Sequence, residues 1–182
     1  MGPLRYLPMP CKHKIVSLHH NLTGFINIKG KEINFNNGIG YIEGDFGTSF
    51  PSNYAWLQCN DFSRKACIFV SVADISVARL QLRGSIGIIY FGGKEYRLAT
   101  YLGARIIMCS RNKLILKQGK LVLEIQVDSI TSRKLIAPRE GKMTRKIEES
   151  ISCQAHFRFS MAGKVLFDET SRNASYEFVT NK

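Results

Sequence analysis

Two carboxylates and a phenol stand at alternate positions of one segment, Tyr41-Ile42-Glu43-Gly44-Asp45. If this segment is an extended strand, successive side chains point to opposite faces, so Tyr41, Glu43 and Asp45 share one face. Two neighbouring carboxyl groups that are shielded from water keep a proton to a higher pH than an isolated one does. Two acids and a phenol therefore converge on one face, and such a group suits general acid chemistry if that face is buried. The alternative is that these acids lie on the solvent face of a hairpin.

The next strand-like run, residues 54–60, has large side chains on one face and small apolar ones on the other. Tyr54, Trp56, Gln58 and Asn60 share the first face. Such a face suits either the wall of a ligand cavity or a wet exterior, and alternation does not choose between them. A tryptophan in this position could equally anchor a hydrophobic core.

Cys11 and His13 are two potential metal ligands, but no second pair at matching spacing accompanies them to complete a zinc site. His13 could instead act as a base, or it could be structural. The five cysteines are odd in number, scattered and free of any CxxC pair, which favours a reducing compartment. We therefore expect no bound metal.

Strand-like alternation recurs at short spacing along most of the chain. The clearest hairpin joins residues 85–91 to 95–101 through Gly92-Gly93-Lys94, because paired glycines supply the positive φ of a tight reversal. Only residues 142–150 favour a helix, and a brief one. Many short strands with hairpin-length loops predict an all-β, antiparallel barrel or sandwich. Closure into a barrel is favoured because it removes long exposed edges.

The chain has 182 residues and a formal net charge of +12. This length fits a single domain over residues 1–182, large enough to bury a core without disulfides. The positive charge favours an anionic partner, such as the surface of a membrane that the protein contacts peripherally. The densest basic run, residues 133–146, also holds Pro138 and Gly141, which indicates a solvated loop more than a nucleic-acid-binding element. Without an apolar run long enough to span a membrane, or a secretory signal, the expected location is the cytoplasm.

Residues 38–62 resemble the tocopherol cyclase family, in which a GYIEKDWG-type motif runs into an SFP turn and a WLQ-type strand. Here the motif is GYIEGDFG at residues 40–47, followed by Ser49-Phe50-Pro51 and Trp56-Leu57-Gln58. Residues 2–8, Cys11-x-His13, residues 96–104, residues 141–145 and Asn173-Ala174 also match in family order. The similarity runs almost end to end over what corresponds to the C-terminal half of a two-domain protein. An N-terminal half or a partner chain would then complete the molecule.

This resemblance implies a lipocalin-like β-barrel that binds a hydrophobic small molecule, a prenylated quinol or another isoprenoid. In the characterised plant members, the phenolic oxygen of a prenylated quinol adds across the first double bond of its tail and closes a chromanol ring. We expect Asp45 to donate the proton, with Glu43 as its partner and His13 as a base. Aromatic faces would stabilise the cation and amides would orient the quinol, and this chemistry requires no cofactor. The expected substrate-binding residues are Tyr41, Phe46, Tyr54, Trp56, Gln58 and Asn60.

Two other hypotheses remain open at the level of the sequence. A non-catalytic barrel that carries a lipid or isoprenoid would keep the cavity without using the acids. A basic barrel that binds nucleic acid has few alternations of arginine and aromatic residues to support it. The family motif also has a lysine and a tryptophan where this chain has Gly44 and Phe46, so one cation and one indole of the motif are absent here.

Overall fold

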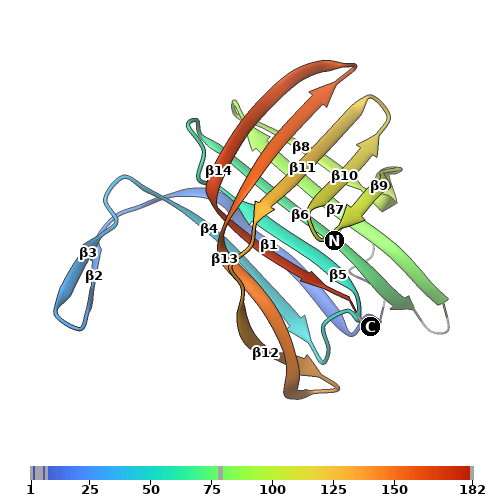
Figure 1. The fold of residues 1–182 in the computed structure, drawn as a ribbon, viewed down its shortest axis with the longest axis horizontal. Coiled ribbons are helices and arrows are strands. Elements are labelled where there is room, and N and C mark those ends of the chain that lie inside the picture. Colours follow the sequence, from blue (N-terminus) through green and yellow to red (C-terminus); the bar gives the residue numbers. More distant parts are fainter. Residues whose placement is uncertain (1, 3–5, 7, 78–79, 181–182) are drawn as a thin grey trace.

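The computed structural model describes residues 2, 6, 8–77 and 80–180 and consists mostly of antiparallel β-strands (Figure 1). The main sheet has ten strands in the order β8-β7-β6-β5-β14-β13-β11-β10-β9, with β12 paired to β13 beside this path. The prediction of an all-β, antiparallel fold is therefore confirmed. The strands are β5 (Tyr54–Cys59), β6 (Ala66–Val77), β7 (Leu80–Phe91), β8 (Lys94–Ala99), β9 (Arg105–Ser110), β10 (Lys113–Gln118), β11 (Leu121–Ser129), β12 (Arg133–Arg139), β13 (Lys142–Met161) and β14 (Lys164–Val179).

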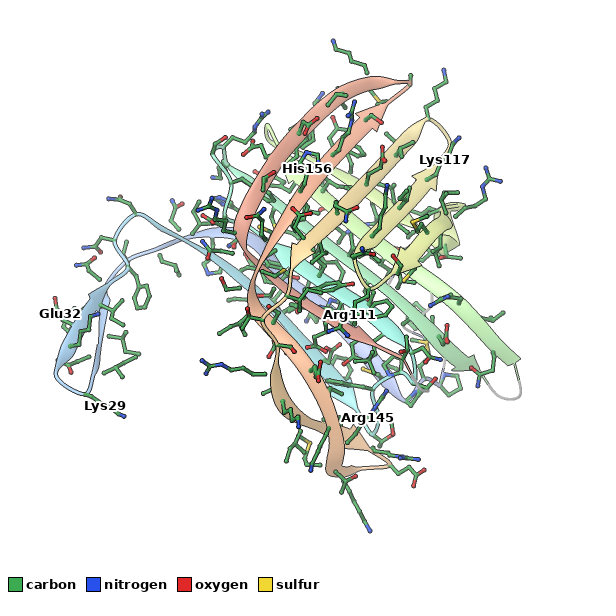
Figure 2. The ribbon with its side chains drawn as sticks, in the orientation of Figure 1. Lys29, Glu32, Arg111, Lys117, Arg145 and His156 are labelled. Carbon is green, nitrogen blue, oxygen red and sulfur yellow. The ribbon has the colours of Figure 1, made fainter. Side chains whose placement is uncertain are left out.

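Two smaller sheets are separate from the main sheet in their backbone hydrogen bonding. Strand β1 (Cys11–Leu22) pairs with β4 (Gly38–Gly47), and β2 (Phe25–Ile28) pairs with β3 (Lys31–Asn34). The β2–β3 hairpin is thus nested inside the longer β1–β4 ribbon. Figure 1 shows the ribbon running beside the main sheet and the β2–β3 hairpin extending away from it; Figure 2 labels Lys29 and Glu32 on that hairpin.

Strand β5 is buried on both faces. Ala55, Leu57 and Cys59 are fully buried in the hydrophobic core, as alternation places them on one face. The other face is covered by the β1–β4 ribbon, whose His13 ring stacks on Phe69 of the neighbouring β6 at 4.8 Å between ring centroids. The face of β5 that carries Tyr54, Trp56 and Gln58 therefore points toward the β1–β4 ribbon and not toward solvent.

The hairpin predicted at Gly92-Gly93 is confirmed, since Phe91 pairs with Lys94 and both glycines have positive φ. The helix predicted for residues 142–150 is wrong, because this segment begins the long strand β13. Its alternation points Ile147 inward, where only 5% of its surface is exposed. A tight turn at Glu140-Gly141 pairs the segment with β12, and this pairing takes up the backbone groups that a helix would use. Among the described residues, no helix is long and apolar enough to cross a membrane.

The Gln118 side chain joins β8 and β10, two strands that are not neighbours along the main sheet. The Ala99 N–H donates to Gln118 Oε1 at 3.0 Å, and Gln118 Nε2 donates to the Arg97 carbonyl at 3.2 Å. Leu98 and Leu116, from these same two strands, share the hydrophobic core beneath. One amide side chain thus satisfies backbone groups of β8 that a neighbouring strand would otherwise pair.

We expect Gln118→Ala to lower the free energy of unfolding by about 1–2 kcal/mol, because a backbone N–H and a carbonyl of β8 lose their partners. Urea unfolding followed by circular dichroism measures this change. Gln118→Glu keeps the acceptor for the Ala99 N–H and loses only the donor to the Arg97 carbonyl. Its stability should therefore lie between those of the wild type and Gln118→Ala. Lys117→Ala, at the neighbouring exposed side chain, is the control. Equal midpoints for Gln118→Ala and the wild type would show that the bridge contributes nothing.

Candidate active site

A cavity of about 740 Å³ is lined by the β1–β4 ribbon, the main sheet and the β12–β13 hairpin. It lies against the face of β5 and β6 that points away from the hydrophobic core, and Tyr54, Trp56 and Ser71 belong to its wall. Its volume is in the range of pockets that enclose small organic ligands. The amphipathic face of residues 54–60 thus forms part of a cavity wall.

Strand register explains which side chains of the main sheet reach the cavity. Ile86, Ser71, Trp56, Glu177 and Glu149 are successive Cα partners across β7, β6, β5, β14 and β13. Residues directly opposite each other in an antiparallel sheet point to the same face. All five line the cavity, so two carboxylates and an indole stand side by side in one row.

His13 lies between the two acids predicted from the sequence. Its Nδ1 atom is 3.0 Å from Asp45 Oδ1, and its Nε2 atom is 3.3 Å from Glu43 Oε2. The register of the ribbon causes this, since His13 is the Cα partner of Asp45 and the acids alternate along β4. The Tyr41 hydroxyl donates to Glu43 Oε2 at 2.6 Å. The predicted common face of Tyr41, Glu43 and Asp45 is therefore present, and we call His13, Glu43 and Asp45 the ribbon cluster.

The ribbon cluster is shielded from solvent to different degrees. The exposed fractions of the side chains are 14% for His13, 18% for Glu43 and 31% for Asp45. Burial raises the pKa of Glu43, while the hydrogen bond from Tyr41 and the charge of His13 act in the opposite direction. The cluster can therefore hold and exchange a proton at the wall of the cavity.

Cys11 contacts the ribbon cluster but lacks the character of a metal ligand or nucleophile. Its Sγ atom is 3.8 Å from Asp45 Oδ1, and burial together with that carboxylate raises the pKa of the Cys11 thiol to about 12. The thiol therefore stays protonated at neutral pH. Over the described part of the chain, no group of three or more histidine, cysteine, aspartate and glutamate side chains is arranged to hold a metal ion.

The main sheet contributes a second pair of titratable groups to the same cavity. The Tyr54 hydroxyl donates to Glu177 Oε2 at 2.5 Å, although 123 positions separate the two residues. Burial raises the pKa of Glu177 to about 7, and Glu149, Asp45 and Glu43 add to this effect. The hydrogen bond from Tyr54 acts in the opposite direction. Glu177 is thus a carboxyl group that keeps its proton close to neutral pH.

Arg145, labelled in Figure 2, belongs to the lining of the cavity and holds a neighbouring turn in place. Its guanidinium group donates to the carbonyls of Pro51 and Ser52, each at 2.6 Å. In addition, the Glu140 N–H donates to Ser49 Oγ at 2.7 Å. These contacts fasten the tip of the β12–β13 hairpin to the Ser-Phe-Pro turn that precedes β5. The conformation of this turn therefore depends on a hairpin nearly 100 residues further along the chain.

The structure brings together some of the residues singled out by the sequence and separates others. His13, Glu43, Asp45, Tyr54 and Trp56 line the cavity, and Tyr41 lies behind Glu43. Four residues expected to bind substrate, Tyr41 among them, are not part of the lining. Each of the other three has a physical reason. Phe46 follows Asp45 on the opposite face and is 59% exposed, Gln58 is buried beside Cys67, and Asn60 lies beyond the end of β5.

Sequence reasoning missed Glu177, Glu149 and Arg145 as residues of the site. Alternation in the last strand does place Glu177 on the face opposite that of the core residue Tyr176. The missing information was the pairing of β14 with β5, which brings Glu177 beside Trp56. No local pattern encodes a pairing between strands so far apart in the sequence.

We expect Glu177→Gln to change how stability depends on pH. The pKa of Glu177 is raised from its usual 4.5 to about 7 in the folded protein, so folding favours its protonated form. The stability that this proton provides is fully present below pH 4.5 and is lost as the pH rises through 7. The free energy of unfolding of Glu177→Gln, measured relative to that of the wild type, should therefore increase by about 2–3 kcal/mol between pH 4.5 and pH 8.

Urea unfolding of both proteins across this pH range measures the difference. Glu32→Gln, on the exposed β2–β3 hairpin, is the control and should run parallel to the wild type. Parallel curves for Glu177→Gln as well would mean that Glu177 titrates normally in the folded protein.

Comparison with known proteins agrees with this architecture. The fold is similar to the crystal structure of kievitone hydratase from Nectria haematococca, with a TM-score of 0.53 and 11% sequence identity. The match covers 93% of this chain and 53% of that one, so this chain spans about half the length of the solved structure, and the likeness supports a lipocalin-like fold. No curated protein matches the sequence. The model of the family described as tocopherol cyclase-like matches residues 1–178, and the chain belongs to this family.

Proposed function

We propose that this protein catalyses the proton-initiated closure of a prenylated quinol to a chromanol. The observation that carries the proposal is the ribbon cluster, a histidine between two carboxylates at the wall of a cavity large enough for such a ligand. Membership of the tocopherol cyclase-like family supports the same class of chemistry.

The reaction transfers one proton in and one proton out. An acid protonates the less substituted carbon of the tail double bond, and a tertiary carbocation forms at the neighbouring carbon. The phenolic oxygen then bonds to that carbon, and its proton leaves to a base, so substrate and product are isomers and no electrons are exchanged. The ribbon cluster can take part in these proton transfers because His13 lies within 3.3 Å of both carboxylates.

Aromatic side chains in the cavity wall suit the cationic intermediate. Tyr54 and Trp56 line the cavity, and Phe50 packs edge-on against Tyr54 with 6.2 Å between the ring centroids. Each ring face near a cation contributes roughly 0.5–2 kcal/mol. Ser71 adds a hydroxyl to this wall that could bind an oxygen of the quinol head.

The experiment is incubation of the purified protein with a prenylated quinol in D₂O, followed by mass spectrometry and NMR of the product. The proposal predicts a chromanol with one deuterium bound to the tail carbon that was protonated. A quinol whose tail lacks the first double bond is the control, and it should bind without reacting. A protein that only carries isoprenoids would bind both compounds and convert neither, and that result would refute the proposed function.

A further inference from the structure

Glu177, the hydrogen-bond partner of Tyr54, lies outside the set of residues that the family resemblance identifies, yet it lies in the same cavity as the ribbon cluster. Tyr54 projects from β5 and Glu177 from β14, so both are fixed by the hydrogen-bond ladder of the main sheet. The ribbon cluster is carried by β1 and β4, which form a different sheet. The cavity thus has titratable groups on two separate structural supports.

A structural role does not account for Glu177. Within the described residues, no lysine, arginine or histidine forms an ion pair with it, and its hydrogen bond comes from the Tyr54 hydroxyl. Arg145, a cation whose charge acts on Tyr54, donates its hydrogen bonds to the carbonyls of Pro51 and Ser52. A carboxyl group that is shielded from water without a counter-ion destabilises the fold when ionised, so such an arrangement calls for a functional explanation.

The charged surroundings of Glu177 favour its protonated form. Glu149 is its Cα partner on β13, and Glu43 and Asp45 face it from β4. Three carboxylates around one carboxyl group disfavour a further negative charge in the cavity. The Tyr54 hydroxyl remains a donor throughout, because burial and the neighbouring Glu177 raise the pKa of Tyr54 well above its usual range.

We propose that Glu177 is the proton donor of the reaction and that the ribbon cluster is the proton acceptor. This inference rests on the proposed function and assigns direction to its two proton transfers. Oε2 of Glu177 accepts the hydrogen bond from Tyr54, which leaves the protonated Oε1 to deliver its proton to the double bond of the substrate. The phenolic proton passes to the His13–Asp45 side, and exchange with solvent returns a proton to Glu177.

The geometry agrees with this direction. Asp45 contacts an imidazole nitrogen at 3.0 Å, and a carboxylate beside a histidine forms the usual arrangement of a base. Glu177 instead accepts a hydrogen bond from a phenol and feels the charge of nearby acids, which is the usual environment of a carboxylic acid that stays protonated. Trp56 lies beside Glu177 in the strand register, so the new cation would form next to an aromatic face.

The test is the pH dependence of kcat/KM for conversion of the prenylated quinol. In the wild type, activity should fall on the alkaline side with an apparent pKa near 7, as Glu177 loses its proton. Glu177→Gln should lower kcat by about 100-fold or more, since an amide cannot donate the proton, and should bind the quinol as the wild type does. Tyr54→Phe should move the alkaline limb to higher pH, because the hydrogen bond that favours ionised Glu177 is lost.

Difference infrared spectroscopy of wild type minus Glu177→Gln provides a readout that does not need turnover. The protonated carboxyl band of Glu177 should disappear between pH 6 and pH 8, around the pKa of about 7. Full activity of Glu177→Gln, or a Glu177 band lost near the usual pKa of 4.5, would overturn the donor assignment while the proposed function stands. Absence of turnover by the wild type would overturn the proposed function, and the donor role with it.

Discussion

Asp45→Asn should lower turnover of a prenylated quinol by about 100- to 10,000-fold, the range expected when a group that transfers protons is removed. The substitution keeps the shape of the side chain and its contact with His13 Nδ1, but it removes the negative charge of the ribbon cluster that lies beside the imidazole. Binding of the quinol should change by no more than about threefold, because the cavity wall keeps its volume and its aromatic residues. Steady-state kinetics together with ligand titration by tryptophan fluorescence measure the two effects separately.

Asp74→Asn is a charge-matched control in the same cavity. Asp74 accepts a hydrogen bond from Asn53 at 2.8 Å and forms an ion pair with Arg83, so a structural role accounts for its carboxylate. This variant should keep most of the turnover. If Asp45→Asn and Asp74→Asn were equally active, the ribbon cluster would have no part in the chemistry.

Gly47→Ala should lower the free energy of unfolding by about 2–4 kcal/mol and reduce turnover by about 100-fold. Gly47 ends β4 at a φ of 152°, and a Cβ atom there would lie 2.1 Å from the Pro10 carbonyl oxygen. That oxygen also accepts hydrogen bonds from the N–H groups of Thr48 and Ser49. Relief of the clash must therefore move the end of the ribbon, two residues from Asp45. Thermal unfolding and kinetics on the same preparation measure both losses.

Gly44→Ala is the matched control on the same strand. A Cβ atom at Gly44 meets nothing within 4 Å, and its φ is not in the positive range. We expect its stability to stay within about 1 kcal/mol of the wild type, with turnover unchanged. Comparable losses for the two variants would mean that the close approach of Gly47 to Pro10 has no special role in placing the acids.

Short-range patterns predicted well what depends on neighbouring residues. The alternation of Tyr41, Glu43 and Asp45 is local geometry, and the structure has these side chains on one face. The all-β character follows in the same way from repeated alternation and glycine turns. The helix predicted for residues 142–150 was wrong because tertiary pairing with β12 outweighed a weak local preference.

The pairing of strands that are far apart in the chain could not be predicted from local sequence patterns. The contact of His13 with Asp45 depends on the pairing of β1 with β4 around a nested hairpin. Both residues were singled out from the sequence, but this pairing was not predicted. Glu177 reaches the site only because β14 pairs with β5. Phe46 shows the limit of a motif, since the family resemblance suggested a binding residue and parity places its ring away from the cavity.

The division of the site between two sheets has a consequence for motion. No ladder of backbone hydrogen bonds joins the ribbon to the main sheet in the described residues, so the ribbon can detach at a lower free energy than global unfolding requires. Its amides should then exchange with deuterated solvent sooner than those of β5 and β6. Detachment of the ribbon would let a hydrophobic ligand enter the cavity, and its return would exclude water from the reacting carbons.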